Sequence, residues 1–162
     1  MCALRALQTP AVKRVLILDL DVHQGDGTAS ILAAVPEAVT CSIHGAKNFP
    51  FRKQMSDLDI ELADDTGDQE YLQALETALE TFPMQDFDLL LYQAGVDALK
   101  DDRLGRLALT REGMDQRNRQ VFEAARKASI PVVIFMGGGY AEPITPTIDA
   151  FEDLYLLAGE YC

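Results

Sequence analysis

Four side chains of the kinds that bind metal ions follow one apolar run near the beginning of the chain. Residues 14–28 read RVLILDLDVHQGDGT, which places Asp19, Asp21, His23 and Asp26 directly after an apolar stretch. In a parallel sheet, reactive groups gather where strands end and the chain turns. Carboxylate oxygens and imidazole nitrogens are ligands for divalent transition metals. The segment therefore predicts one side of a metal site.

A carboxylate after another strand could complete this site. Asp97 follows an apolar run at residues 87–92. Residues two apart on a strand share a face, so Asp21 and His23 should point the same way, and Asp97 can reach them from a neighbouring strand. Two carboxylates and one imidazole leave positions open for water and substrate, which suits a catalytic Zn²⁺ or another borderline divalent metal.

Three other polar positions have more than one interpretation. Tyr140 follows glycines 137–139, and a tight turn there would expose its hydroxyl as a donor to a developing oxyanion. The alternative is a half-buried tyrosine at a strand end. We expect His44 to be structural or to support a ligand. Asp101, Asp102 and Arg103 should form a solvated loop or a local ion pair.

The elements that must position these residues can be read from the apolar pattern. We expect strands at residues 15–22, 38–44, 58–62, 87–92 and 131–136. Helices are expected at residues 2–7, 29–35, 69–82, 110–128 and 148–157. This succession is typical of an α/β domain with three layers, in which helices cover both faces of a mostly parallel sheet of about five strands. Residues 1–162 should form one domain.

Composition excludes several classes of protein. A hydrophobic content of 48% with 25% charged residues indicates a globular chain rather than a disordered one. The net charge of −12 argues against direct binding of nucleic acid, because phosphates require a basic surface. No apolar run approaches the roughly 20 residues that span a bilayer. The three cysteines have no metal-type spacing, so we expect reduced thiols and a cytoplasmic protein.

Five segments together resemble the histone deacetylase family, which includes bacterial deacetylases and acetylpolyamine amidohydrolases with an arginase-like fold. The segments read LDLDVHQGDGT, CSIH, DDTGDQEYL, YQAGVDALKDDRLGRLALT and MGGGY, in the order of the family. Gln24 stands at a position where many members have a second histidine. In this feature the chain resembles the bacterial and class IV branch of the family. The resemblance implies a zinc-dependent hydrolase of acetylated amines, of the acetyl-lysine or acetylpolyamine type.

The resemblance also implies roles for individual residues. Asp21, His23 and Asp97 would be the zinc ligands, and Tyr140 would stabilise the transition state. A second site, for K⁺, would use the backbone carbonyls of Asp19, Asp21 and His23 together with Ser42 and Ile43.

The chain departs from the family in its acid–base machinery. In the family a tandem histidine pair upstream of the DxDxH segment does this work, whereas this chain contains two histidines, His23 and His44, and neither matches the pair. Asp19 and Asp26 would each orient one of the missing histidines. The resemblance therefore covers the C-terminal half of a deacetylase domain. We expect weak activity or none from this chain alone, unless Asp26 replaces the base.

The same comparison predicts an exposed sheet edge. In the family the five expected strands lie side by side, and further strands would pair with the strand at residues 131–136. We therefore expect a second copy of the chain, an N-terminal half-domain or a rearranged terminus to cover that edge.

Two other functions remain open. One is a non-catalytic metal-binding or assembly module of the same fold. The other is a phosphatase of the haloacid dehalogenase type, in which Asp19 would be the nucleophile of an Asp-x-Asp motif and Mg²⁺ would be bound.

Overall fold

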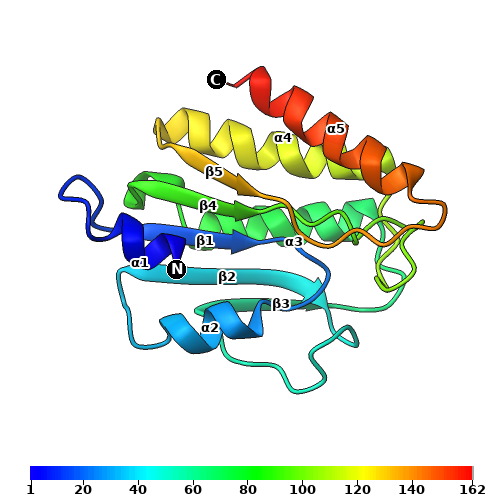
Figure 1. The fold of residues 1–162 in the computed structure, drawn as a ribbon, viewed down its shortest axis with the longest axis horizontal. Helices are drawn as coiled ribbons and strands as arrows, with labels where there is room; N and C mark the ends of the chain where they lie inside the picture. The colour runs from blue at the N-terminus through cyan, green and yellow to red at the C-terminus, as the bar shows by residue number, and fades with distance from the viewer. Residues whose placement is uncertain (162) are drawn as a thin grey trace.

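Residues 1–161, which the computed structural model describes, contain five strands that all run parallel in one sheet. The strands are β1 (Val15–Asp19), β2 (Ala38–Gly45), β3 (Leu58–Leu62), β4 (Leu89–Gln93) and β5 (Val132–Phe135). Their order across the sheet is β3-β2-β1-β4-β5 (Figure 1). The expected α/β fold with five adjacent strands is confirmed, and the sheet is parallel throughout.

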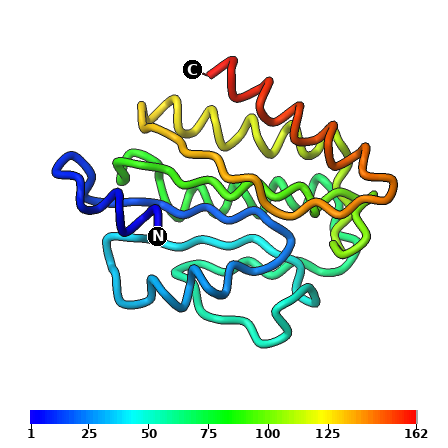
Figure 2. The backbone as a smooth tube through the Cα atoms, in the orientation of Figure 1, coloured from blue at the N-terminus to red at the C-terminus, as the bar shows by residue number. Residues whose placement is uncertain are grey.

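Helices pack on both faces of this sheet. The helices are α1 (Cys2–Ala6), α2 (Asp26–Leu32), α3 (Asp68–Thr81), the 3₁₀ helix η1 (Met84–Asp86), α4 (Arg111–Ala128) and α5 (Thr145–Gly159). In Figure 1, α1 and α2 lie in front of the sheet, whereas α3 and α4 lie behind it. The chain trace in Figure 2 shows the same three layers. The predicted three-layer architecture is therefore present.

The central strand β1 has apolar contacts on both faces. Leu16 and Leu18 belong to the large core under α3, α4 and α5, whereas Val15 and Ile17 belong to a smaller core under α1 and α2. A strand covered on both faces needs apolar residues at every position. This requirement explains the uninterrupted apolar run before Asp19.

The first strand is shorter than the sequence pattern predicts. It ends at Asp19, not at residue 22. The backbone N–H of Asp21 donates to Asp19 Oδ1 at 3.1 Å, and the N–H of His23 donates to Asp21 Oδ1 at 3.0 Å. Aspartate side chains that bind nearby N–H groups compete with the hydrogen bonds of a strand. The predicted metal ligands therefore lie in a turning segment and not on the strand itself.

Other predicted bounds differ from the structure by a few residues at the ends of elements. The largest of these differences are in α2, which begins at Asp26 and not at residue 29, and in α5, which begins at Thr145 and not at residue 148. The helix α4 has the predicted N-cap, because the Oγ1 of Thr110 accepts a hydrogen bond from the N–H of Gly113 at 3.0 Å.

In the part of the chain that the structure describes, no helix combines the length and the apolar character that a membrane span requires. Cys2 is exposed, Cys41 is buried, and Cys162 lies outside the described residues.

Candidate metal centre

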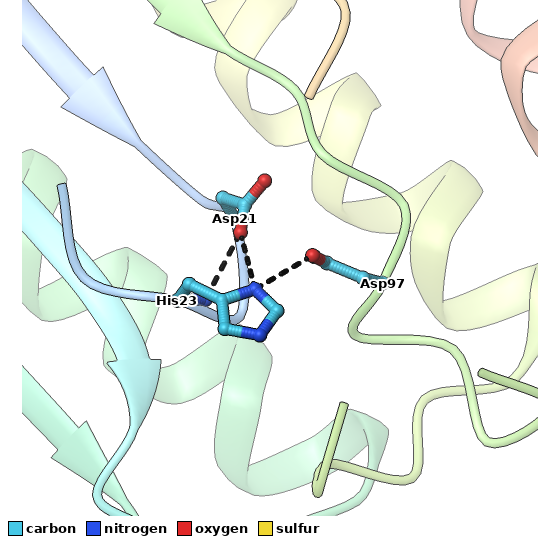
Figure 3. A group of neighbouring side chains, drawn as sticks. All are labelled: Asp21, His23 and Asp97. Atoms are coloured by element: carbon cyan, nitrogen blue, oxygen red, sulfur yellow. Dashed lines mark hydrogen bonds and ion pairs between the residues drawn. The ribbon is translucent and has the colours of Figure 1, made fainter. Parts of the chain in front are cut away.

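The three predicted ligands meet at the ends of neighbouring strands. Asp21 and His23 lie in the loop after β1, and Asp97 lies in the loop after β4 (Figure 3). Each residue offers one ligand atom, and these atoms all lie within 4.8 Å of one another. His23 Nδ1 is 3.1 Å from Asp21 Oδ1 and 3.0 Å from Asp97 Oδ2. The structure thus brings together the set that the sequence pattern indicates.

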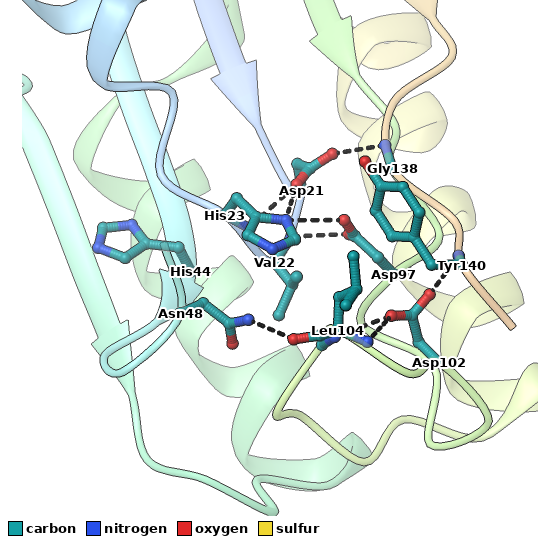
Figure 4. Close-up of polar contacts among 12 residues, drawn as sticks. Asp21, Val22, His23, His44, Asn48, Asp97, Asp102, Leu104, Gly138 and Tyr140 are labelled. Carbon is teal, nitrogen blue, oxygen red and sulfur yellow. Dashed lines mark hydrogen bonds and ion pairs between the residues drawn. The ribbon is translucent and has the colours of Figure 1, made fainter. Parts of the chain in front are cut away.

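Backbone N–H groups hold the two carboxylates in place. The N–H of Val22 donates to Asp97 Oδ1 at 2.9 Å, and the N–H of Gly138 donates to Asp21 Oδ2 at 2.7 Å (Figure 4). In each carboxylate, one oxygen binds a backbone N–H from another part of the chain and the other oxygen faces the His23 ring, and Asp21 Oδ1 also accepts from the N–H of His23. Orientation of ligand side chains by such outer contacts is a common feature of metal sites.

The group concentrates negative charge in a buried place. Asp97 is 0% exposed, and burial raises its pKa to about 6. Hydrogen bonds to Asp21 and Asp97 raise the pKa of His23 to about 10, whereas the pKa of Asp21 is lowered despite its burial, because His23 donates to it. A proton on His23 thus supplies positive charge between the two carboxylates.

This donor set fits a divalent transition metal. Two carboxylate oxygens and one imidazole nitrogen lie close together, and a bound metal would take the place of the proton on that nitrogen. Three protein ligands with an open position are typical of catalytic zinc sites. Asp21, His23 and Asp97 would hold the metal.

Tyr140 lies beside the three ligands. Its side chain points towards them in Figure 4, and its ring packs edge-on against the ring of His23 with 6.3 Å between centroids. Burial and the charges of Asp97 and Asp21 raise the pKa of the hydroxyl, which keeps it protonated at neutral pH. The tyrosine is 45% exposed, so a substrate can reach it. It can therefore donate a hydrogen bond to an oxygen bound at this site.

Asp102 has a role that the sequence pattern does not predict. Its Oδ2 accepts a hydrogen bond from the N–H of Tyr140 at 2.6 Å. Its other oxygen accepts from the N–H groups of Leu104 and Gly105, at 2.8 Å each. These contacts join the loop after β4 to the loop after β5. Asp102 lies in a loop, as expected, but its bond to Tyr140 was not predicted, because only folding brings the loop after β5 close to it.

The two other aspartates of the first segment are not members of the ligand group. Among the described residues, this group includes neither Asp19 nor Asp26. Asp19 lines a cavity of about 350 Å³ with Gln93 and Phe135, on the side of α1 and α2. Burial and the charge of Asp21 raise the pKa of Asp19 well above its usual range. Asp26 begins α2, and its Oδ1 accepts from the N–H of Gly27 at 2.9 Å. The roles expected for these two residues stay predictions.

The residues of the predicted K⁺ site are neighbours in the sheet. Asp19 on β1 is the register partner of Ser42 on β2, and Ile43 follows Ser42. The Oγ of Ser42 lies 2.9 Å from His44 Nδ1. Burial lowers the pKa of His44, which favours the neutral imidazole. His44 therefore packs beside this region as a structural histidine, and binding of K⁺ stays a prediction.

Comparison with known proteins places this chain in a family. A family model described as "Histone deacetylase domain" matches residues 1–150. An uncharacterized protein of Picosynechococcus sp. is 47% identical over 85% of this chain and 46% of its own length. Histone deacetylase 2 of Arabidopsis thaliana is 34% identical over 88% of this chain and 38% of its own length. The histone deacetylase-like amidohydrolase of Pseudomonas aeruginosa is 31% identical over 83% of this chain and 39% of its own length.

Solved structures agree with the fold. The acetylpolyamine aminohydrolase of Burkholderia pseudomallei superposes with a TM-score of 0.76 at 21% identity, over 89% of this chain and 44% of that chain. A histone deacetylase homologue solved in complex with SAHA gives a TM-score of 0.69 at 25% identity, over 83% of this chain and 39% of that chain. The chain spans less than half the length of these relatives. The chain belongs to the histone deacetylase family.

Proposed function

We propose that this chain carries the metal centre of a deacetylase-type hydrolase that acts on acetylated amines. The observation that carries the proposal is the convergence of Asp21, His23 and Asp97 beside the ring of Tyr140. Membership of the histone deacetylase family supports the reaction class. The names of the relatives, histone deacetylases and an acetylpolyamine aminohydrolase, support acetyl-lysine or an acetylpolyamine as substrate. The donor set of two carboxylates and one imidazole supports zinc as the metal.

Different residues of the chain have different roles in amide hydrolysis. A bound divalent metal supplies Lewis-acid polarisation of a carbonyl and lowers the pKa of water. Asp21, His23 and Asp97 would hold the metal, and the N–H groups of Val22 and Gly138 keep the two carboxylates oriented. The Tyr140 hydroxyl donates to the carbonyl oxygen of the acetyl group, where negative charge develops during attack.

Neither His44 nor Asp26 is well suited to take the proton of the attacking water. His44 is 0% exposed and has a lowered pKa. Asp26 binds the N–H of Gly27 at the beginning of α2 and is therefore a poor substitute for a general base. Loss of an acid–base group typically costs about 10²–10⁴-fold in rate. The chain alone should therefore turn over slowly.

Replacement of Tyr140 by phenylalanine tests the proposal. With saturating Zn²⁺, hydrolysis of an acetyl-lysine peptide or acetylspermidine is measured for both forms. We expect Tyr140→Phe to lower kcat by about 10²–10³-fold, because one donor to the oxyanion is lost. The affinity for Zn²⁺ should stay the same, because the hydroxyl is not a ligand.

Other outcomes would assign a different function. Zinc binding without turnover, and without binding of SAHA by calorimetry, would indicate the non-catalytic metal-binding module. Release of phosphate from an ester with Mg²⁺ would indicate the phosphatase, although Asp19, its required nucleophile, lies outside the ligand group. Equal kcat values for Tyr140→Phe and the unmutated chain would remove Tyr140 from the mechanism.

We also propose that a polypeptide supplying the rest of a deacetylase domain covers the open side of the sheet at β5. In Figure 1, α1 and α2 lie in front of β1, β2 and β3 and leave the front of β5 uncovered. Val133 of β5 is 42% exposed, and Met136 after it is 62% exposed. The Oε1 atom of Gln93 is buried in the adjacent cavity without a hydrogen-bond partner in residues 1–161. A partner with apolar side chains and N–H donors would cover Val133 and Met136 and would donate a hydrogen bond to Gln93 Oε1.

Light scattering across a concentration series tests this surface. Without the partner, the purified chain should self-associate through the exposed strand. Val133→Lys should weaken association by at least about tenfold, equivalent to about 1.4 kcal/mol, because it places a charge in the contact. Ile31→Lys is the matched control, since Ile31 is 66% exposed on α2. A chain that stays monomeric at every concentration would contradict the proposal, and so would equal effects of the two variants.

A further inference from the structure

A buried arginine lies behind the metal centre. Arg117 of α4 is 0% exposed. Arginine stays protonated in proteins, and a buried charge is costly unless hydrogen bonds compensate for lost hydration. Within residues 1–161 its guanidinium forms no ion pair with a carboxylate. The hydrogen bonds of this guanidinium must therefore compensate for its lost hydration, and their partners indicate the role of Arg117 in the structure.

One nitrogen of the guanidinium connects the two loops that carry the ligands. Nη1 of Arg117 donates to the carbonyl of Leu20 at 3.3 Å and to the carbonyl of Gly95 at 2.8 Å. The carbonyl of Leu20 belongs to the peptide unit before Asp21, and Gly95 lies two residues before Asp97. A single cationic group thus spans the loops after β1 and β4.

The backbone of Gly95 also limits where Asp21 can lie. A Cβ atom at Gly95 would be 2.4 Å from Asp21 Oδ2 and 2.8 Å from Asp21 Cγ. The carboxylate therefore packs directly against this backbone. A movement of the loop at Gly95 would displace Asp21 as well as Asp97, which follows in the same loop.

The guanidinium is itself fixed in orientation. Nε and Nη2 of Arg117 both donate to Asn118 Oδ1, at 3.1 Å each. The same oxygen accepts from the hydroxyl of Tyr92 at 2.6 Å. The guanidinium carbon lies 5.9 Å from the centroid of the Tyr92 ring, within range of a cation–π interaction. These contacts leave Nη1 aimed at the two carbonyls.

We propose that Arg117 is a positioning residue of the metal centre. It fixes the spacing of the loops after β1 and β4, so that Asp21 and Asp97 can bind one cation together. This role rests on the metal centre proposed above. Lysine cannot replace it, because a compact ammonium lacks the planar fork that reaches Asn118 and both carbonyls at once.

Titration with Co²⁺, which reports ligand geometry through its visible absorption, tests this role in the 162-residue chain. We expect Arg117→Lys to weaken Co²⁺ binding by about 10–100-fold, as loss of outer-shell partners does, and to change the absorption spectrum. Asn118→Ala, which keeps the guanidinium but releases it, should act in the same direction. Val121→Ala is the matched control, because Val121 is 0% exposed one turn further along α4. Its affinity should stay within about twofold of the unmutated chain.

Amide hydrogen exchange of the metal-free chain gives a second measurement. The N–H groups of Val22 and Gly138, which bind Asp97 and Asp21, should exchange at least about tenfold faster in Arg117→Lys than in Val121→Ala. Unchanged affinity, spectrum and exchange in Arg117→Lys would overturn the proposal. If this variant does not fold, the same readouts on Asn118→Ala decide. If the unmutated chain does not bind Co²⁺, the metal centre is refuted, and the exchange rates still decide the role of Arg117.

Discussion

Replacement of Asp21 by alanine should abolish specific binding of Zn²⁺ by the chain. Asp21 contributes one of the three converging ligand atoms, and its second oxygen is held by the N–H of Gly138. Loss of a direct ligand should cost more than the roughly 10–100-fold that loss of an outer-shell partner costs. His23→Ala should have the same effect. Zinc content after gel filtration and competition with a chromophoric chelator measure both variants.

An exposed carboxylate in the loop after β4 offers a control for the loss of negative charge. Asp101→Ala removes an exposed carboxylate four residues after Asp97 and should leave the affinity for Zn²⁺ unchanged. Circular dichroism establishes that each variant is folded. Unchanged zinc content in both Asp21→Ala and His23→Ala would show that the metal centre is wrongly placed.

Replacement of Gly138 by alanine should also destroy the metal centre, although it changes no ligand. A Cβ atom at Gly138 would lie 1.9 Å from Asp97 Oδ2 and 2.7 Å from Asp97 Cγ. The carboxylate cannot easily move away, because the N–H of Val22 holds its other oxygen. The φ angle of Gly138 is not in the left-handed region, so the effect comes from lack of space. We expect the affinity for Zn²⁺ to fall by about 100-fold or more, at or beyond the upper range for outer-shell changes.

The same change at an open position is the control. A Cβ atom at Gly27 in α2 would have no heavy atom within 4 Å, so Gly27→Ala should bind Zn²⁺ with the affinity of the unmutated chain. Isothermal titration with Zn²⁺ compares the two variants directly, and urea unfolding measures their stabilities. Equal Zn²⁺ affinities for Gly138→Ala and Gly27→Ala would show that the turn after β5 does not shape the centre.

Local patterns in the sequence predict most of the elements of this fold. The strand at residues 58–62 is found at the predicted positions, and α4 begins after the predicted cap, Thr110. Such features depend on apolar periodicity and on hydrogen bonds between residues close in sequence. The end of β1 was predicted wrongly because the carboxylates of Asp19 and Asp21 bind N–H groups two residues further on and stop the strand.

The sequence alone determined the ligand types of the candidate centre, because aspartate and histidine after buried strands are recognisable without coordinates. Only the tertiary structure decided how those ligands are held. The N–H of Gly138 reaches Asp21 across 117 positions, and the guanidinium of Arg117 reaches Leu20 across 97 positions. A glycine in a turn and an arginine on a helix have no local signal for such roles. Contacts of this kind exist only after parallel strands bring distant loops to one edge of the sheet.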